Sequence, residues 1–209
     1  MRSRARPKRA TAEKRSYRLG VRAETAAETG RLILRATIEL YGERFYDQVS
    51  LDDIAERAGV TVQTLIRRFG SKDELISAAA SAARETIRSQ REETQVGDTA
   101  GATKALVQTY EAHGDRVLRM LAQEDRVPAF RLITDTGRAY HHEWVDSIFA
   151  PLLAKQTRRE RERLRAQIIA VCDVYVWKVL RRDLGLSSEE TQRALLQMLA
   201  ALGATTATK

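Results

Sequence analysis

The chain has 209 residues, a net charge of +8 at pH 7 and one cysteine, Cys172. A single cysteine excludes an internal disulfide framework and a cysteine zinc cluster and fits a reducing cytoplasm, and within the run IIAVCDVYVW we interpret Cys172 as a small core residue. Proline is scarce and no apolar run reaches about 20 residues, so we expect an all-α, cytoplasmic protein without a membrane span.

The first 22 residues carry the whole excess of positive charge. They contain nine Lys or Arg and one acid, Glu13, whereas residues 23–209 hold equal numbers of each sign. We predict a disordered basic arm over residues 1–22, because so few apolar side chains cannot build a core. Such an arm can lie along phosphates or enter the minor groove, which makes Arg18 and Arg22 candidate DNA contacts. A solvated tail without function is the alternative.

Two helices are predicted in the segment that follows. An apolar face over residues 33–41 indicates a helix that can cover its neighbours. Ser50 and Asp53 make an S-x-x-D capping pattern before a helix from Leu51 to Ala58. Gly59 ends that helix, because glycine adopts a positive φ without a Cβ clash and so permits a sharp turn.

The helix after this turn has one apolar and one polar face. We predict that it runs from Val62 to Phe69 behind Thr61 as its capping residue. At about 100° per residue, the apolar arc contains Val62, Leu65, Ile66 and Phe69. The opposite arc contains Gln63, Thr64, Arg67 and Arg68. Arg can bridge guanine O6 and N7, and Gln can bridge adenine N6 and N7, in the major groove. A polar face that is merely solvated is the alternative.

We predict DNA contacts from this polar face and its surroundings. Ser71 and Glu74 form another capping pattern, so a further helix begins directly and places Lys72 in its first turn, where exposed amides also favour a phosphate. The candidate DNA-binding residues are Thr61, Val62, Gln63, Thr64, Arg67, Arg68 and Lys72, together with Arg18 and Arg22 of the arm.

Residues 29–75 resemble the DNA-binding domain of the TetR family of transcriptional repressors. The family pattern is an I-L-x-A helix, then S-[LV]-x-x-I-A-x-x-A-G-V-[ST]-x-x-T-L-Y-x-H-F, then S-K-[DE]-E-L. It is matched by Ile33, Leu34, Ala36, Ser50, Leu51, Ile54, Ala55, Ala58, Gly59, Val60, Thr61, Thr64, Leu65, Phe69, Ser71, Lys72, Asp73, Glu74 and Leu75. The resemblance implies an all-α fold of about nine helices, with a three-helix helix-turn-helix head before a ligand-binding and dimerisation domain.

The chain departs from the family pattern at three positions. Ile66 and Arg68 stand where the family has a tyrosine and a histidine that commonly touch DNA phosphates. Ile66 cannot donate to a phosphate and Arg68 can, so we expect a rearranged backbone contact. Phe45 replaces the usual glycine before the aromatic Tyr46, which puts that turn in question because a bulky residue resists a positive φ.

Behind the head, the sequence predicts a helical body. One helix runs from Ser71 to about Thr94, and residues 95–101 break the pattern. Pro128 suits the first turn of a later helix. Gly137 is predicted to divide a short helix from a longer one, which Pro151 kinks or ends.

We predict that a small, largely apolar effector binds between these helices. The candidate effector-binding residues are Tyr110, His113, Phe130, Tyr140 and Trp144. Ordinary core packing is the alternative for each of them. His141, His142 and Glu143 are neighbours, but adjacent helical residues point about 100° apart and no HExxH pattern occurs, so we expect no metal and no cofactor.

Two amphipathic helices, over residues 164–180 and 186–203, are predicted near the end of the chain. They resemble the paired C-terminal helices through which TetR proteins form a four-helix dimer interface, which implies a homodimer. The candidate interface residues are Ile168, Val171, Tyr175, Leu195 and Leu199. Asp173 is unexplained inside the apolar run, and Arg181 or Arg182 is a candidate partner.

Together these patterns predict a sequence-specific DNA-binding regulator, a repressor that a small molecule releases from a palindromic operator. We assign residues 23–70 to the DNA-binding head and residues 71–209 to the effector and dimerisation domain. An activator, or a nucleoid-type protein of low sequence specificity, is the alternative within the same fold. An enzyme is not expected, because no paired acid and base, nucleophile elbow, phosphate loop or metal constellation occurs in the sequence.

Overall fold

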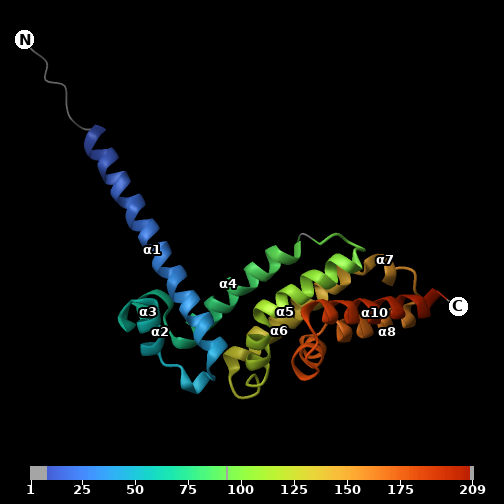
Figure 1. The fold of residues 1–209 in the computed structure, drawn as a ribbon. Coiled ribbons are helices and arrows are strands. Elements are labelled where there is room, and N and C mark those ends of the chain that lie inside the picture. Colours follow the sequence, from blue (N-terminus) through green and yellow to red (C-terminus); the bar gives the residue numbers. More distant parts are fainter. Residues whose placement is uncertain (1–8, 93, 208–209) are drawn as a thin grey trace, which may run out of the picture.

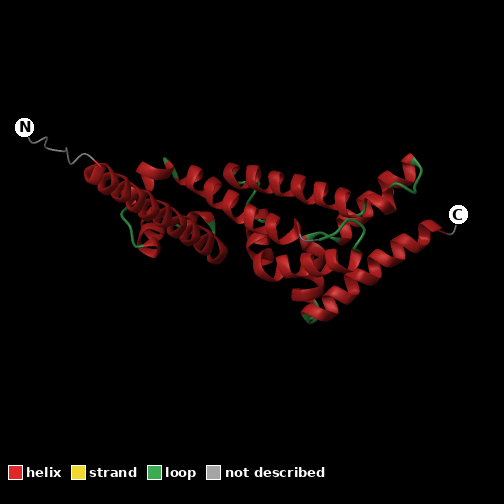
Figure 2. Ribbon diagram, turned by 90° about the horizontal axis from the view of Figure 1, so that it is seen from above, coloured by secondary structure: helices red, strands yellow, loops and turns green. Residues whose placement is uncertain are grey.

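The computed structural model describes residues 9–92 and 94–207. Within these ranges every regular element is a helix and no strand occurs, which agrees with the predicted all-α class. The α-helices are α1 (Arg9–Glu43), α2 (Leu51–Ala58), α3 (Val62–Phe69), α4 (Lys72–Glu92), α5 (Thr99–Leu121), α6 (Pro128–Ile148), α7 (Ala150–Leu153), α8 (Arg158–Val171), α9 (Val174–Lys178) and α10 (Ser188–Ala207). The start of α1 and the end of α10 lie at opposite ends of an elongated molecule (Figure 1; Figure 2).

None of the described helices has the length and apolar character that crossing a membrane requires.

Helix α1 is longer than the sequence predicts. It begins at Arg9 and projects far beyond the helices that pack on its other end (Figure 1). The backbone of residues 9–22 is therefore helical, and the prediction of a disordered arm is wrong for this part, while residues 1–8 lie outside the described residues. Ala, Glu, Lys and Arg are good helix formers, and extending an existing helix avoids the unfavourable nucleation step.

The head consists of the second half of α1 with α2 and α3. Ile33, Leu40, Ile54 and Leu65 are buried in its core. The predicted caps are present: the Ser50 hydroxyl accepts from the Asp53 amide while the Asp53 carboxylate accepts from the Ser50 amide, and the Thr61 hydroxyl accepts from the amide of Thr64. Because these caps end and restart the helices within a few residues, α2 and α3 meet at a tight turn, as predicted.

Glycine and phenylalanine behave differently at the two turns of the head. Gly59 has φ 66°, the left-handed conformation that a glycine adopts without strain. Phe45 has φ −72° and ψ 161°, which is extended backbone open to any residue. The turn after α1 therefore does not need a glycine, and Phe45 causes no distortion there.

The body is built on α4, which leads from the head into the rest of the molecule. The Ser71 hydroxyl accepts from the Glu74 amide at 3.2 Å, and the Glu74 carboxylate accepts from the Ser71 amide at 2.7 Å, so the predicted capping box starts this helix. The main core lies farther along and includes the buried side chains of Leu106, Ile168 and Trp177.

Helix α6 corrects one prediction. Pro128 lies in its first turn as predicted, but the helix continues through Gly137 to Ile148 and is not divided. A glycine inside a helix costs only about 1 kcal/mol relative to alanine, which packing on both sides can offset. Pro151 lies in the first turn of α7, directly after the end of α6.

A second correction concerns Asp173. The sequence predicts one continuous helix through this residue, whereas α8 ends at Val171 and α9 begins at Val174. The Asp173 carboxylate accepts from the Tyr175 amide at 2.9 Å and so caps α9. The predicted pairing with Arg181 or Arg182 is wrong, because those guanidinium groups bind other carboxylates. Arg181 pairs with Glu111 at 2.9 Å, and Arg182 pairs with Asp115 at 2.9 Å.

Candidate DNA-binding head and effector cavity

Helix α3 presents part of its polar face as predicted. Leu65 is fully buried against α1 and α2, while Gln63 and Arg67 are exposed. Thr61 is exposed, and Val62 and Thr64 are half-buried. Figure 1 shows α2 and α3 on the side of α1 that faces away from the body, so this surface is open to a large partner.

The packing arc of α3 is narrower than the sequence predicts. Ile66 is 50% exposed, so its assignment to the packed face is wrong. It lies about 100° around the helix from Leu65, which is the side chain that points into the core. Ile66 therefore adds an apolar group to the presented face, beside Arg67.

Two of the predicted phosphate donors, Lys72 and the exposed Arg68, lie against other parts of the head. The Arg68 guanidinium lies so close to Gly30 of α1 that a Cβ added to this glycine would come within 3 Å of it. The ammonium group of Lys72 donates to the carbonyl oxygen of Tyr46 at 3.0 Å and lies 4.1 Å from the centre of the Tyr46 ring. Burial lowers the pKa of Lys72. The side chains of Arg18 and Arg22 lie outside the described residues.

A cavity of about 310 Å³ lies between α1, α4, α5 and α6, with the start of α9 at one end. Four of the five predicted effector residues line it, namely Tyr110, His113, Phe130 and Tyr140. Trp144 is buried behind this wall. All three histidines of the chain, His113, His141 and His142, line the same cavity.

One face of α4 forms the long wall of the cavity. The wall residues on this helix are Ile76, Ala79, Ala80, Ala83, Arg84, Ile87 and Arg91. They recur every three or four residues, and 15 residues separate the first from the last, which corresponds to about 22 Å of helix. Arg91 was not among the predicted effector residues: its spacing continues the apolar face of α4, but an arginine at that position does not by itself indicate burial.

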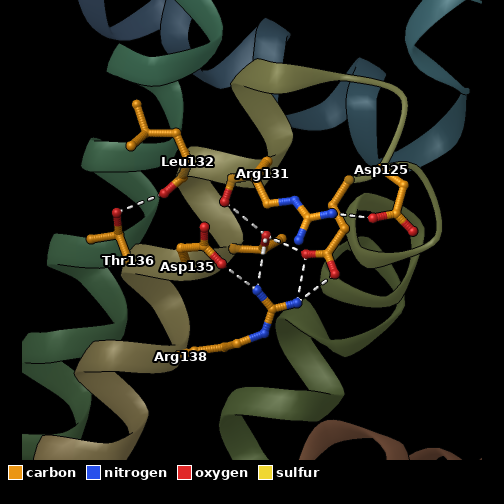
Figure 3. Close-up of polar contacts among 8 residues, drawn as sticks. Asp125, Arg131, Leu132, Asp135, Thr136 and Arg138 are labelled. Carbon is orange, nitrogen blue, oxygen red and sulfur yellow. Dashed lines mark hydrogen bonds and ion pairs between the residues drawn. The ribbon is translucent and has the colours of Figure 1, made fainter.

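On α6, the cavity wall includes Arg138, whose charge is neutralised by neighbouring carboxylates. The Arg138 guanidinium is 2.5 Å from a carboxylate oxygen of Glu124 and 2.7 Å from one of Asp135 (Figure 3). The hydroxyl group of Thr134 also donates to Glu124. Hydrogen bonding to Arg138 lowers the pKa of Glu124, so this carboxylate is held in its charged form.

The far end of the cavity is different. Arg91 is 4% exposed and is surrounded by rings: its guanidinium carbon lies 4.8 Å from the ring centre of Trp144 and 5.9 Å from those of Tyr110 and Tyr140. Burial lowers the pKa of His141 to about 3, with the charge of Arg91 acting in the same direction. This end of the cavity therefore combines a buried cation with a neutral imidazole.

The predicted dimer residues are mostly inside the monomer. Ile168, Leu195 and Leu199 are 0%, 1% and 4% exposed and pack in the main core, so the prediction that they face a partner is wrong. Each points from its helix toward the other helices of the same chain. Val171 is half-buried, and Tyr175 is 52% exposed.

Within the described ranges, no group of three or more His, Cys, Asp or Glu residues could hold a metal ion.

Comparisons with known proteins agree with this arrangement. The model of the family described as bacterial regulatory proteins, tetR family, matches residues 33–79, which covers most of the head and the start of α4. No curated protein sequence matches the chain. A transcriptional regulator from Rhodococcus sp. RHA1 has 16% identity over 86% of this chain and 98% of its own, with a TM-score of 0.67.

Two further solved structures have the same fold. A putative TetR-family regulator from Rhodococcus sp. has 20% identity and a TM-score of 0.66, over 84% of this chain and 99% of its own. A TetR transcription regulator from Haloarcula marismortui has 14% identity and a TM-score of 0.65, over 86% of this chain and 98% of its own. A helix-turn-helix head on a helical body defines a DNA-binding transcriptional regulator. Residues 33–79 of the chain match the DNA-binding domain of the TetR family of these regulators, and the whole chain shares their fold.

Proposed function

We propose that this protein is a repressor that leaves its operator when a small molecule occupies the cavity. One observation carries the proposal: Tyr41, Ile76 and Phe130 belong to the core of the head and also line the cavity. A ligand in the cavity therefore touches side chains on which the head is packed. Release by a ligand adds a regulatory step to the DNA-binding function of the family. We also propose that the protein acts in the cytoplasm, where it can reach its DNA.

The contacts between head and body supply a route for coupling. The rings of Tyr41, Tyr46 and Phe130 lie 5.7 to 6.1 Å apart, centre to centre. Just after α5, the Gln123 side chain accepts from the Tyr46 amide at 2.9 Å, and within α5 the Arg119 guanidinium donates to the Gly42 carbonyl at 3.1 Å. A ligand that repacks this cluster changes the angle at which α1 and α4 hold the head.

For DNA, we propose that Gln63 and Arg67 read base edges, because both extend from the exposed face of α3. Exposed Ile66 suits contact with a thymine methyl group. We assign positioning contacts to Thr61, Val62 and Thr64 at the start of α3, and to Arg68 and Lys72 through the donors that their internal contacts leave free.

We propose a two-fold homodimer, which places two heads on one operator. Support comes from apolar side chains that the monomer leaves exposed in α9, in the segment directly after it and on α10. They are Tyr175, Val179, Leu184 and Met198, with exposures of 52%, 47%, 66% and 39%. We assign the interface to this surface instead of to the buried faces of α8 and α10.

The test is a DNA titration with and without a cavity ligand, combined with footprinting at physiological salt. A ligand-released repressor protects a near-palindrome and loses affinity when ligand is added, by about 1 to 3 kcal/mol of coupling. Protection of no discrete site would indicate a low-specificity DNA-binding protein instead. An activator would increase transcription from the bound promoter in a reconstituted assay.

A further inference from the structure

Arg91 is a buried cation for which the described residues provide no carboxylate partner. It lies in the last turn of α4, lines the cavity and is 4% exposed. Its Nε atom has no hydrogen-bond partner, and no carboxylate of the described residues forms an ion pair with its guanidinium group. A buried charge is strongly unfavourable unless an opposite charge or several acceptors approach it. The uncharged hydroxyl of Tyr110 interacts with Arg91, so within the described residues this guanidinium group has a neutral partner but no balancing charge.

The other charges of the cavity do not compensate Arg91. Among the described lining residues, four are arginines and Asp173 is the one acid. The Asp173 carboxylate caps α9 through the Tyr175 amide and forms no ion pair with Arg91. Arg138 is bound by Glu124 and Asp135 at the opposite side of the wall. The cavity thus keeps an excess of positive charge around its deepest arginine.

The surroundings of Arg91 hold its guanidinium group in place for an acceptor. The ring of Trp144 at 4.8 Å and the rings of Tyr110 and Tyr140 at 5.9 Å fix the cation by cation–π attraction. Further buried donors nearby are without partners in the described chain, including Nε2 of His113 and Nε1 of Trp144. A planar guanidinium matches the two oxygens of a carboxylate in a bidentate pair.

The rest of the cavity is mainly apolar and long. From Arg91 toward the head, the α4 wall is formed mainly by alanine and isoleucine over about 22 Å of helix. At the head end, it closes on the apolar side chains of Met120 and Phe130 and on the ring of Tyr41. This shape fits an extended molecule with an apolar body and one polar end.

We propose that the cavity binds an elongated organic acid, with its carboxylate on Arg91 and its apolar body along α4 toward Phe130. The proposal rests on the proposed function in taking this cavity as the effector site, and it adds the chemical class of the effector. The carboxylate supplies the acceptors that Arg91 lacks, and the apolar body reaches the ring cluster of Tyr41, Tyr46 and Phe130 that joins body and head.

The direct test measures binding to the full-length protein without DNA. The probes are unbranched carboxylates from octanoate to tetradecanoate, with dodecan-1-ol and dodecylammonium as uncharged and cationic matches to dodecanoate. Calorimetry measures affinity, and tryptophan fluorescence, to which Trp144 beside Arg91 and Trp177 both contribute, gives a second measurement. We expect at least one carboxylate to bind, and dodecanoate to bind about 10- to 100-fold more tightly than the alcohol or the amine, as expected for hydrogen bonds to a charged group.

Two matched variants locate this preference. Arg91→Met removes the cation but keeps an unbranched side chain close in length to the aliphatic part of arginine, and Arg88→Met makes the same change at an exposed position one turn earlier on α4. We expect Arg91→Met to bind dodecanoate and dodecan-1-ol alike, and Arg88→Met to discriminate as the wild type does. Thermal unfolding without ligand gives a second measurement: Arg91→Met should be as stable as the wild type or more stable, because an uncompensated charge is removed.

Four outcomes would overturn the proposal: no binding by any carboxylate, equal binding of dodecanoate and dodecan-1-ol by the wild type, discrimination that survives in Arg91→Met, or a large loss of stability in that variant. A separate DNA titration tests the proposed function. If dodecanoate binds through Arg91 but leaves DNA affinity unchanged, the assignment of the acid site holds and release by ligand fails.

Discussion

Arg67 and Gln63 are the exposed side chains of α3 that carry donors and acceptors suited to base edges. We predict that Arg67→Ala and Gln63→Ala each weaken specific binding by about 1 to 3 kcal/mol and relax base preference at one position. Competition assays with single-base operator variants measure both effects. Arg88→Ala on the distant part of α4 is the control, and unchanged affinity and preference in Arg67→Ala would show that α3 does not read the bases.

His141 gives stability a pH dependence. Burial lowers its pKa to about 3, whereas an unfolded histidine titrates near about 6.5, so below about pH 6.5 the unfolded state binds a proton that the folded state does not. Stability is therefore complete above about pH 6.5 and declines as the pH falls toward about 3. Urea unfolding at pH 7.5 and pH 5 should show a loss of about 1 to 2 kcal/mol that His141→Leu lacks. Equal losses in both proteins would contradict this.

Two helical glycines predict opposite responses to alanine. A Cβ at Gly114 would lie 2.5 Å from the buried Trp177 ring, so Gly114→Ala must push α5 and α9 apart. Overpacking costs about 1 to 3 kcal/mol, which exceeds or cancels the gain of about 1 kcal/mol in helix propensity. A Cβ at Gly137 meets no described atom within 4 Å, so Gly137→Ala should stabilise by about 0.5 to 1 kcal/mol. Denaturant unfolding of both variants measures their free energies of unfolding. If Gly114→Ala were the more stable of the two, the Trp177 ring would be able to move aside and the prediction would fail.

At the scale of helices, short sequence patterns are sufficient to predict a helix start when the capping interaction involves only neighbouring residues. The caps at Ser50, Thr61 and Ser71 each act within three residues, so the sequence predicts the starts of α2, α3 and α4 correctly. Gly137 and Asp173 misled because their effects depend on neighbours. Packing around α6 outweighs one glycine, and the apolar residues on both sides of Asp173 concealed a helix start that its carboxylate caps.

The cavity could be predicted only in part. Aromatic residues at helical spacing indicated Tyr110, Phe130 and Tyr140 correctly as neighbours of one space. The buried state of Arg91 depends on how α4 packs against α5 and α6, which no local pattern contains. The same limit explains the dimer residues: periodicity identified the apolar side of α10, but not that Leu195 and Leu199 are covered by the same chain.

We predict that the basic segment of residues 1–22 contributes to DNA binding by neutralising phosphates. Removing residues 1–22 should leave the packed part of α1 folded and should flatten the salt dependence of DNA binding, since the log-log slope falls by about 0.9 for each phosphate that the protein no longer neutralises. Affinity measured across a salt series gives the slope. Replacing only the Lys and Arg residues of this segment by Gln is the control for length, and an unchanged slope in both proteins would exclude phosphate binding by this segment.

For the whole molecule, a two-fold dimer should place the two α3 helices about 34 to 36 Å apart, one turn of DNA. We predict that Val179→Glu and Met198→Glu produce monomers, because a buried unpaired carboxylate is unfavourable in an interface. Sedimentation at micromolar concentration measures the mass. Leu132→Glu, at a 64% exposed site on α6, is the matched control and should remain dimeric. A monomeric wild type, or dissociation by Leu132→Glu alone, would exclude the proposed interface.

Tyr41, Ile76 and Phe130 complete the core of the head and also line the cavity. The hydrophobic core of the head therefore includes side chains that the body contributes. An excised fragment of residues 23–70 would lack Ile76 and Phe130 and expose the apolar surface that they cover. Thermal unfolding of the intact chain should then proceed in one cooperative step, with a single heat-absorption peak, instead of a separate melting of each part. Substitutions deep in the cavity would accordingly change the melting of the DNA-binding surface without touching it.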